Sequence, residues 1–133
     1  MTDALKKLRE IDSRLLDPGL AVQIFEALPD AIFMVDSVGI IQFVNHQAEL
    51  LTGYHRIELF DKPIEILIPE AFRDKHILER TEYFLEPRPR AMAIGLQLSA
   101  IRKNGEQFTV EINLSPIVTP QGIYVLAVMR KKR

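Results

Sequence analysis

Apolar and polar residues alternate along the last third of the chain, which is the pattern of strands with one buried face. Even-numbered apolar residues share that face over 91–101 and 107–118: Met92, Ile94, Leu96, Leu98, Phe108, Val110, Ile112 and Leu114. An Asn-Gly turn at 104–105 joins these runs into a hairpin, and residues 122–132 form another strand. The pattern predicts three long antiparallel strands.

Two shorter apolar runs, 31–36 and 40–44, lie nearer the N-terminus. The turn sequence Ser-Val-Gly separates them, which predicts a first hairpin. A short helix follows, because Asn45 is a good N-cap and Gly53 is a good C-terminal stop.

Three further segments have helical spacing. Residues 1–18 end at Pro18-Gly19, residues 21–28 form a short second helix, and residues 70–85 form a longer central helix after Pro69. The first segment carries an apolar stripe of Leu5, Leu8, Ile11 and Leu15. This stripe either covers the chain's own sheet or pairs with its copy in a second subunit.

This order of elements predicts an α+β fold. Two strands, several short helices and three long strands form a five-stranded antiparallel sheet with helices packed on one face, preceded by an amphipathic helix. The 133 residues suffice for one hydrophobic core. We therefore expect an N-terminal helix over 1–19, for dimerisation or for covering the sheet, and one domain over 20–133.

Composition and charge exclude several classes of function. A net charge of −1 gives no extended field for a polyanion, so we expect neither a nucleic-acid partner nor a membrane partner. The chain has no cysteine, which excludes disulfides and thiolate chemistry. No paired catalytic groups stand out, so we expect no enzyme. A charged N-terminus without a long apolar run predicts a cytoplasmic protein.

Three stretches together resemble a PAS domain: AIFMVDSVGIIQFVNHQAELLTGY, KPIEILIPEAFRDKH and GLQLSAIRKNGEQFTVEINLSPI. They occur in the family's order and cover roughly residues 28–130. The resemblance implies a sheet order of 2-1-5-4-3 and a sensory module of bacterial signalling proteins, as in two-component systems. Such a module holds a small molecule, or nothing, between its inner sheet face and its central helices.

The expected ligand site is apolar, with few polar groups. We place it between the central helix, the apolar run at 64–67 and the inner faces of strands 91–101 and 107–118. Its predicted residues are His76, Ile64, Leu67, Arg80, Met92, Ile94, Leu96, Val110, Ile112 and Leu114. The ligand stays unidentified, and the lack of cysteine excludes flavin–cysteine photochemistry.

His76 is the residue with alternative interpretations. It resembles the iron ligand of the haem PAS oxygen sensors of rhizobia, which would make it an axial haem ligand and the metal residue of the site, with haem b as cofactor. Those sensors carry arginines where this chain has Leu96 and Glu82. These departures favour a hydrogen-bonded His76 that anchors the central helix over the sheet. His46 and His55 are expected on the surface.

The resemblance also implies partners. We expect signalling through a homodimer formed by residues 1–18 and a sheet face, and an effector such as a histidine kinase, which this chain does not contain. The chain is either a piece cut at a domain boundary or a stand-alone domain. A ligand-free dimerisation or interaction module is the remaining alternative.

Overall fold

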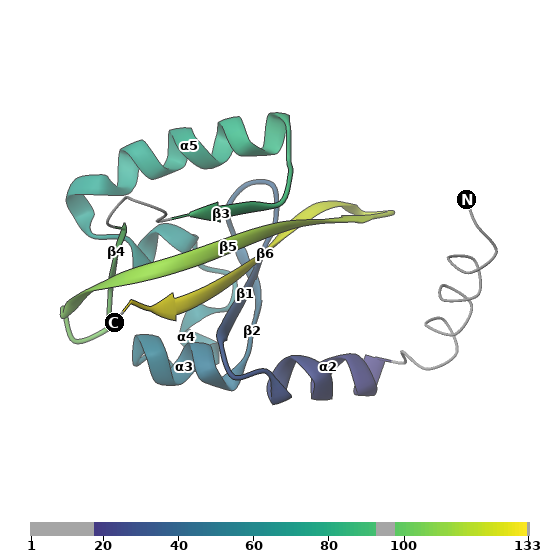
Figure 1. Ribbon diagram of the computed structural model, residues 1–133, viewed down its shortest axis with the longest axis horizontal. Coiled ribbons are helices and arrows are strands. Elements are labelled where there is room, and N and C mark those ends of the chain that lie inside the picture. Colours follow the sequence, from purple (N-terminus) through teal and green to yellow (C-terminus); the bar gives the residue numbers. More distant parts are fainter. Residues whose placement is uncertain (1–17, 93–97, 133) are drawn as a thin grey trace.

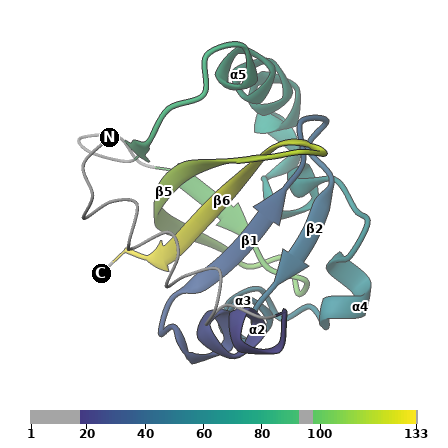
Figure 2. The same ribbon diagram turned by 90° about the vertical axis from the view of Figure 1, so that its right-hand side faces the viewer.

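The computed structural model describes residues 18–92 and 98–132, and Figures 1 and 2 show its elements. The first helix, predicted over 1–18, therefore lies almost entirely outside the described residues. The helical elements are α2 (Pro18–Ala27), α3 (His46–Thr52), α4 (Arg56–Leu59), the 3₁₀ turns η1 (Ile64–Leu67) and η2 (Glu70–Phe72), and α5 (Arg73–Leu85). The strands are β1 (Ala31–Val35), β2 (Ile41–Val44), β3 (Arg90–Met92), β4 (Leu98–Ile101), β5 (Gln107–Thr119) and β6 (Gly122–Lys131).

The sheet is antiparallel, in the order β2-β1-β6-β5-β3, and β4 also pairs with β5. β3 and β4 are the two ends of the strand predicted over 91–101, and residues 93–97 between them lie outside the described residues. Counted as one strand, they give the predicted order 2-1-5-4-3. The predicted fold is confirmed.

The helices α2 and α5 begin at other residues than predicted. In both cases the difference lies at or just after a proline, Pro18 or Pro69. α2 begins at Pro18, because proline fits the first turn of a helix, where its missing N–H costs no hydrogen bond. After Pro69 the chain first makes the turn η2, and α5 starts only at Arg73. Phe72 separates the two with φ −110° and ψ 1°, outside the helical region.

The core lies between the inner sheet face and the helices α3, α4 and η1. Each helical element contributes one fully buried apolar side chain, namely Ala48, Leu59 and Leu67. The even-numbered residues of β5 lie on the inner face as predicted: Phe108 and Val110 are buried, and Ile112 and Leu114 are partly buried against the core. Figures 1 and 2 show α5 at one end of the sheet and α2 and α3 at the opposite end.

Asn45 joins three elements at the α2 end. Its Oδ1 accepts hydrogen bonds from the amides of Ala48 (3.0 Å) and Ile32 (2.9 Å). Its Nδ2 donates to the carbonyls of Phe25 (3.0 Å) and Asp30 (2.9 Å). The side chain is fully buried, and all its hydrogen-bonding capacity is used. The predicted helix cap therefore also connects α2, β1 and α3.

Candidate functional site

The floor of the candidate site is the part of the inner sheet face formed by β5. Val110 is buried there, whereas Ile112 and Leu114 are only partly covered. Both pair with β3, Ile112 with Met92 and Leu114 with Arg90. This end of the sheet therefore keeps apolar side chains that the protein's own core does not enclose.

One wall of the site is η1, which runs between Pro63 and Pro69. Leu67 is buried in the core and Ile64 packs against it. Glu65, on the same turn, is also buried, with 5% of its surface exposed. A buried carboxylate is costly unless it is paired and hydrogen-bonded. Its partners therefore determine how this wall is held.

Glu65 is paired with two residues one turn apart on α5. Its Oε2 lies 2.6 Å from His76 Nδ1 and 3.0 Å from Arg80 Nε, and Oε1 accepts a hydrogen bond from Arg80 Nη2 at 3.1 Å. The Arg80 guanidinium therefore binds the carboxylate in a bidentate manner. We call Glu65, His76 and Arg80 the Glu65 latch, because they attach α5 to η1.

The latch also touches the turn between β1 and β2. The Arg80 guanidinium lies so close to Gly39 that a Cβ at this position would overlap it. Gly39 has φ +85°, which already favours glycine. Asp36 completes the turn, because its Oδ1 accepts from the amides of Val38 and Ile40, both at 3.0 Å. The latch thus connects α5, η1 and the first hairpin.

Apart from the latch, α5 is attached loosely. None of its 13 residues is fully buried. The exposed fraction of Leu78 is 67%, and Ile77 and Leu85 are exposed too. Tyr83 near its end donates a hydrogen bond to the carbonyl of Arg88, and partial burial raises the pKa of this phenol. An ordinary packed helix would bury an apolar stripe.

Seven of the ten predicted site residues contact the core cluster or the latch: Leu67 and Val110 belong to the core, Ile64, Ile112 and Leu114 pack against it, and His76 and Arg80 bind Glu65 of η1. Met92 lies on β3, and nothing is described of its side chain. Ile94 and Leu96 lie outside the described residues. The expected hydrogen-bonded arrangement of His76 is present, but its role in ligand binding stays a prediction.

Sequence reasoning missed Glu65. The signal was a single carboxylate inside the apolar run IEILIP, between two prolines. It also missed that His55 caps α4: Nδ1 accepts from the amide of Ile57 at 3.2 Å, and Glu58 completes a capping box. His46 and His55 are both exposed, as predicted.

A second polar cluster attaches α2 to α3 and α4. Arg56 pairs with Glu49 at 2.9 Å and with Glu26 of α2 at 3.3 Å, and Glu26 also accepts from the amide of His46. Partial burial raises the pKa of Glu49, but hydrogen bonds from the side chain and amide of Arg56 outweigh this and lower it to about 2. Glu49 and Arg56 therefore both stay charged at neutral pH.

Two kinds of feature are absent from the part of the chain that the structure describes. Within 18–92 and 98–132, no three His, Asp or Glu side chains gather as a metal site would require. Over the same ranges, no helix has both the length and the apolar character needed to cross a membrane.

Comparisons with known proteins agree with this geometry. Residues 20–132 match the family described as the PAS fold. The sensor protein FixL of Bradyrhizobium diazoefficiens is 30% identical over 91 residues, a match that covers 68% of this chain and 18% of FixL. The chain thus spans less than a fifth of the length of this relative.

Solved structures show the same fold. The PAS domain of an HTR-like protein from Haloarcula marismortui has a TM-score of 0.70 at 24% identity, covering 97% of this chain and 98% of that one. A PAS domain from a two-component sensor histidine kinase has a TM-score of 0.71 at 16% identity, covering 86% and 95%. The chain belongs to the PAS family, the sensory domains of signalling proteins such as sensor kinases.

Proposed function

We propose that this PAS domain senses a small apolar ligand that binds between α5 and the inner sheet face. One observation carries the proposal: α5 has no fully buried side chain, while Ile112 and Leu114 at the same end of the sheet are only partly covered. The apolar side chains of α5 and of this part of β5 thus remain partly exposed, whereas in a packed core they would cover each other. A ligand between them would bury both.

The Glu65 latch is the contact through which such a ligand would change the position of α5. The latch residues are hydrogen-bonded to one another, and within 18–92 and 98–132 the other side-chain hydrogen bonds from α5 to neighbouring segments come from Arg73 and Tyr83. A ligand that fits only one position of α5 would shift the population toward that position. We expect the shift to reach the first hairpin, because Arg80 touches Gly39.

We expect the domain to pass its signal to a partner through α2 and the outer sheet face. On α2, Val22 and Ile24 are exposed, and a partner could cover these two side chains. Met34, Leu126 and Val128 on the outer face are only partly buried. We propose a homodimer through residues 1–18 and this face, with a histidine kinase as effector, the class to which one structural neighbour belongs.

A blocking substitution tests the ligand site. We expect Leu114→Trp to occupy the proposed ligand site and to reduce binding of the apolar dye anilinonaphthalene sulfonate by about fivefold or more. Ser115→Trp is the matched control, because it places the same side chain on the opposite face of the same strand. Equal dye binding by both variants and the unmodified protein would refute the site.

Haem binding at His76 is the second candidate function. The observation in its favour is the 2.6 Å hydrogen bond between His76 Nδ1 and Glu65, because metal-ligating histidines commonly donate their other ring N–H to a carboxylate. Nε2 has no protein partner within 18–92 and 98–132. His76 would hold the iron and Arg80 would face a propionate. The haem would supply binding of a diatomic gas or a change of redox state.

Spectroscopy separates the two candidates. If haem is the ligand, added haem gives a Soret band that His76→Ala abolishes, while His46→Ala, at an exposed histidine, leaves it unchanged. If the band is absent, or persists in His76→Ala, haem ligation by His76 is excluded. Native mass spectra without any co-purified molecule, together with failed dye binding, would favour the third candidate, a ligand-free dimerisation module.

A further inference from the structure

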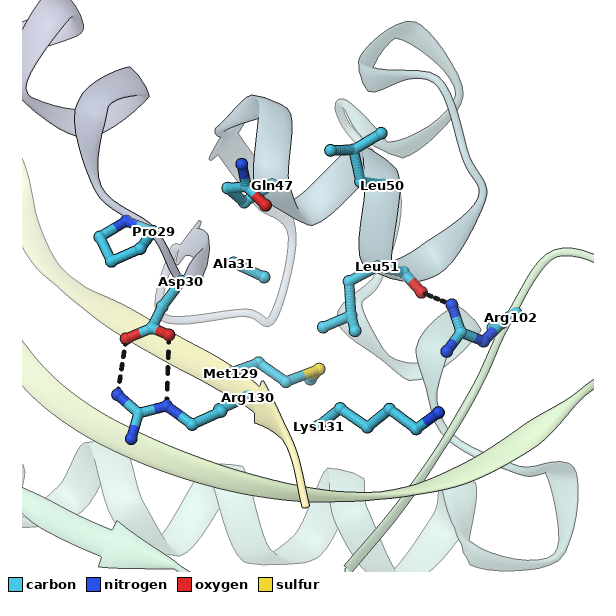
Figure 3. A pocket seen from close by; sticks show the side chains of 10 residues that line it. All are labelled: Pro29, Asp30, Ala31, Gln47, Leu50, Leu51, Arg102, Met129, Arg130 and Lys131. Atoms are coloured by element: carbon cyan, nitrogen blue, oxygen red, sulfur yellow. Dashed lines mark hydrogen bonds and ion pairs between the residues drawn. The ribbon is translucent and has the colours of Figure 1, made fainter. Parts of the chain in front are cut away.

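A pocket with a volume of about 300 Å³ lies at the end of the sheet opposite α5 (Figure 3). It is formed by α3, the start of β1, the end of β6 and Arg102, which follows β4. Leu50, Leu51 and Met129 give it apolar walls. None of the predicted ligand-site residues lines it, so it is a separate site.

Positive charge dominates this pocket. Its lining includes three cations, Arg102, Arg130 and Lys131, but only one carboxylate, Asp30. Asp30 is occupied by Arg130, which donates to both of its oxygens at 2.8 and 3.2 Å. Arg102 and Lys131 are left without a carboxylate inside the pocket. Figure 3 shows their charged ends on the same side of it.

Arg102 and Lys131 each have N–H groups that form no hydrogen bond within the described residues. Arg102 donates Nη1 to the carbonyl of Leu51 and lies over the Phe108 ring at 4.3 Å. Its buried Nε makes no hydrogen bond within the described residues, although Glu106 Oε2 lies at an ion-pair distance of 3.5 Å. Lys131 forms no ion pair with any residue of the described ranges. Lys131 therefore brings to the pocket a positive charge that no carboxylate of the described residues pairs with, beside the partly compensated charge of Arg102.

We propose that this pocket binds a small organic carboxylate. The acid group lies between Arg102 and Lys131, where a planar guanidinium and a flexible ammonium offer charge-assisted donors. The apolar part lies on Leu50, Leu51 and Met129. The volume suits a molecule of a few carbon atoms.

A ligand in this pocket would contact both the α2–β1 connection and the end of the last strand. Its walls include Pro29 and Asp30, which lead from α2 into β1, and Arg130 and Lys131 at the end of β6. A bound anion would connect the last strand to α3 and Arg102, and would stabilise the folded state by an amount that rises with the logarithm of its concentration above Kd. This inference does not depend on the apolar site under α5.

Titration of the whole chain with hexanoate, followed by amide NMR shifts, tests the proposal. We expect saturable shifts at Leu51, Arg102 and Lys131, and a rise in melting temperature. Lys131→Gln should weaken binding by about fivefold or more. Lys62→Gln, which removes an exposed lysine outside this pocket, is the control and should leave binding unchanged.

Two further ligands test whether binding needs both the carboxylate and the apolar chain. Hexanol has the same apolar chain without the charge, and should cause no saturable shift at Lys131. Inorganic phosphate carries charge without an apolar part, and should bind several times more weakly than hexanoate. Hexanoate affinity that is equal in the Lys131→Gln and Lys62→Gln proteins, or that is matched by hexanol or by phosphate, would overturn the assignment.

Discussion

Substituting Glu65 by glutamine should loosen α5 and destabilise the domain. The change keeps the shape of the side chain but removes the charge that holds both His76 and Arg80. Glu65 is buried, and its exposed fraction is only 5%. Water therefore cannot replace the lost partner at this position without opening the η1–α5 junction.

The magnitude follows from the number and burial of the contacts. Removing one partner of a buried ion pair costs about 3–5 kcal/mol, because the other charge stays buried and unpaired. The side chains of Arg80 and His76 are 19% and 27% exposed, so water compensates part of this loss. We expect the free energy of unfolding to fall by about 2–3 kcal/mol, and the melting temperature by about 8–12 °C.

Urea unfolding of four proteins measures the effect and its origin. They are the unmodified chain, Glu65→Gln, Arg80→Leu and the double variant. Because the two residues are in contact, their effects should not add, and the coupling free energy should be about 1–3 kcal/mol. Glu70→Gln, at an exposed carboxylate on the neighbouring turn, is the control and should change stability by about 0.5 kcal/mol or less.

Amide hydrogen exchange shows which elements lose stability in the Glu65→Gln protein. Glu65→Gln should speed amide exchange in α5 more than in β5 and β6, because α5 has no fully buried side chain to hold it once the latch is broken. The reasoning is refuted if Glu65→Gln costs no more than Glu70→Gln, or if Glu65 and Arg80 show no coupling.

Two further predictions concern single contacts. The lowered pKa of Glu49, about 2, gives stability that is present above its unfolded value of 4.5 and is lost as the pH falls toward 2. Glu49→Gln should therefore cost about 1–2 kcal/mol at pH ~7, after solvent screening, and almost nothing at pH ~2 in urea unfolding. Gly39→Ala should cost more in thermal unfolding than Gly105→Ala, because both have positive φ but only Gly39 touches Arg80. Equal losses from the two glycine substitutions would show that the contact contributes nothing.

Local chemistry made most of the fold predictable from the sequence. Two of the hairpins depend on turn residues within a few positions of one another: Asp36 and Gly39 between β1 and β2, Asn104 and Gly105 between β4 and β5. The helix cap at Asn45 is also a short-range hydrogen bond. Alternation along β5 then determines which face is buried, whereas the sheet order came from the resemblance to PAS domains.

The polar contacts of the candidate site were less predictable, because they join distant segments. Helical spacing placed His76 and Arg80 on one side of α5, but it contained no information about their partner. Glu65 precedes them by 11 and 15 residues and belongs to a different element. The cationic pocket was missed for the same reason, since Arg102 and Lys131 meet only through the pairing of β5 with β4 and β6.

The first hairpin is the element that α5 and α2 have in common. Arg80 of the latch touches its turn at Gly39, while Asn45 binds α2 and the start of β1 at its opposite end. A displacement of α5 that moves Arg80 therefore acts on one end of the same two strands whose other end holds α2. Because Asn45 is fully buried and fully hydrogen-bonded, this end is rigid and passes on a movement instead of absorbing it. Under the proposed function, the ligand signal thus reaches α2 along β1 and β2, and it also reaches β6, which pairs with β1 from Ala31 to Val35.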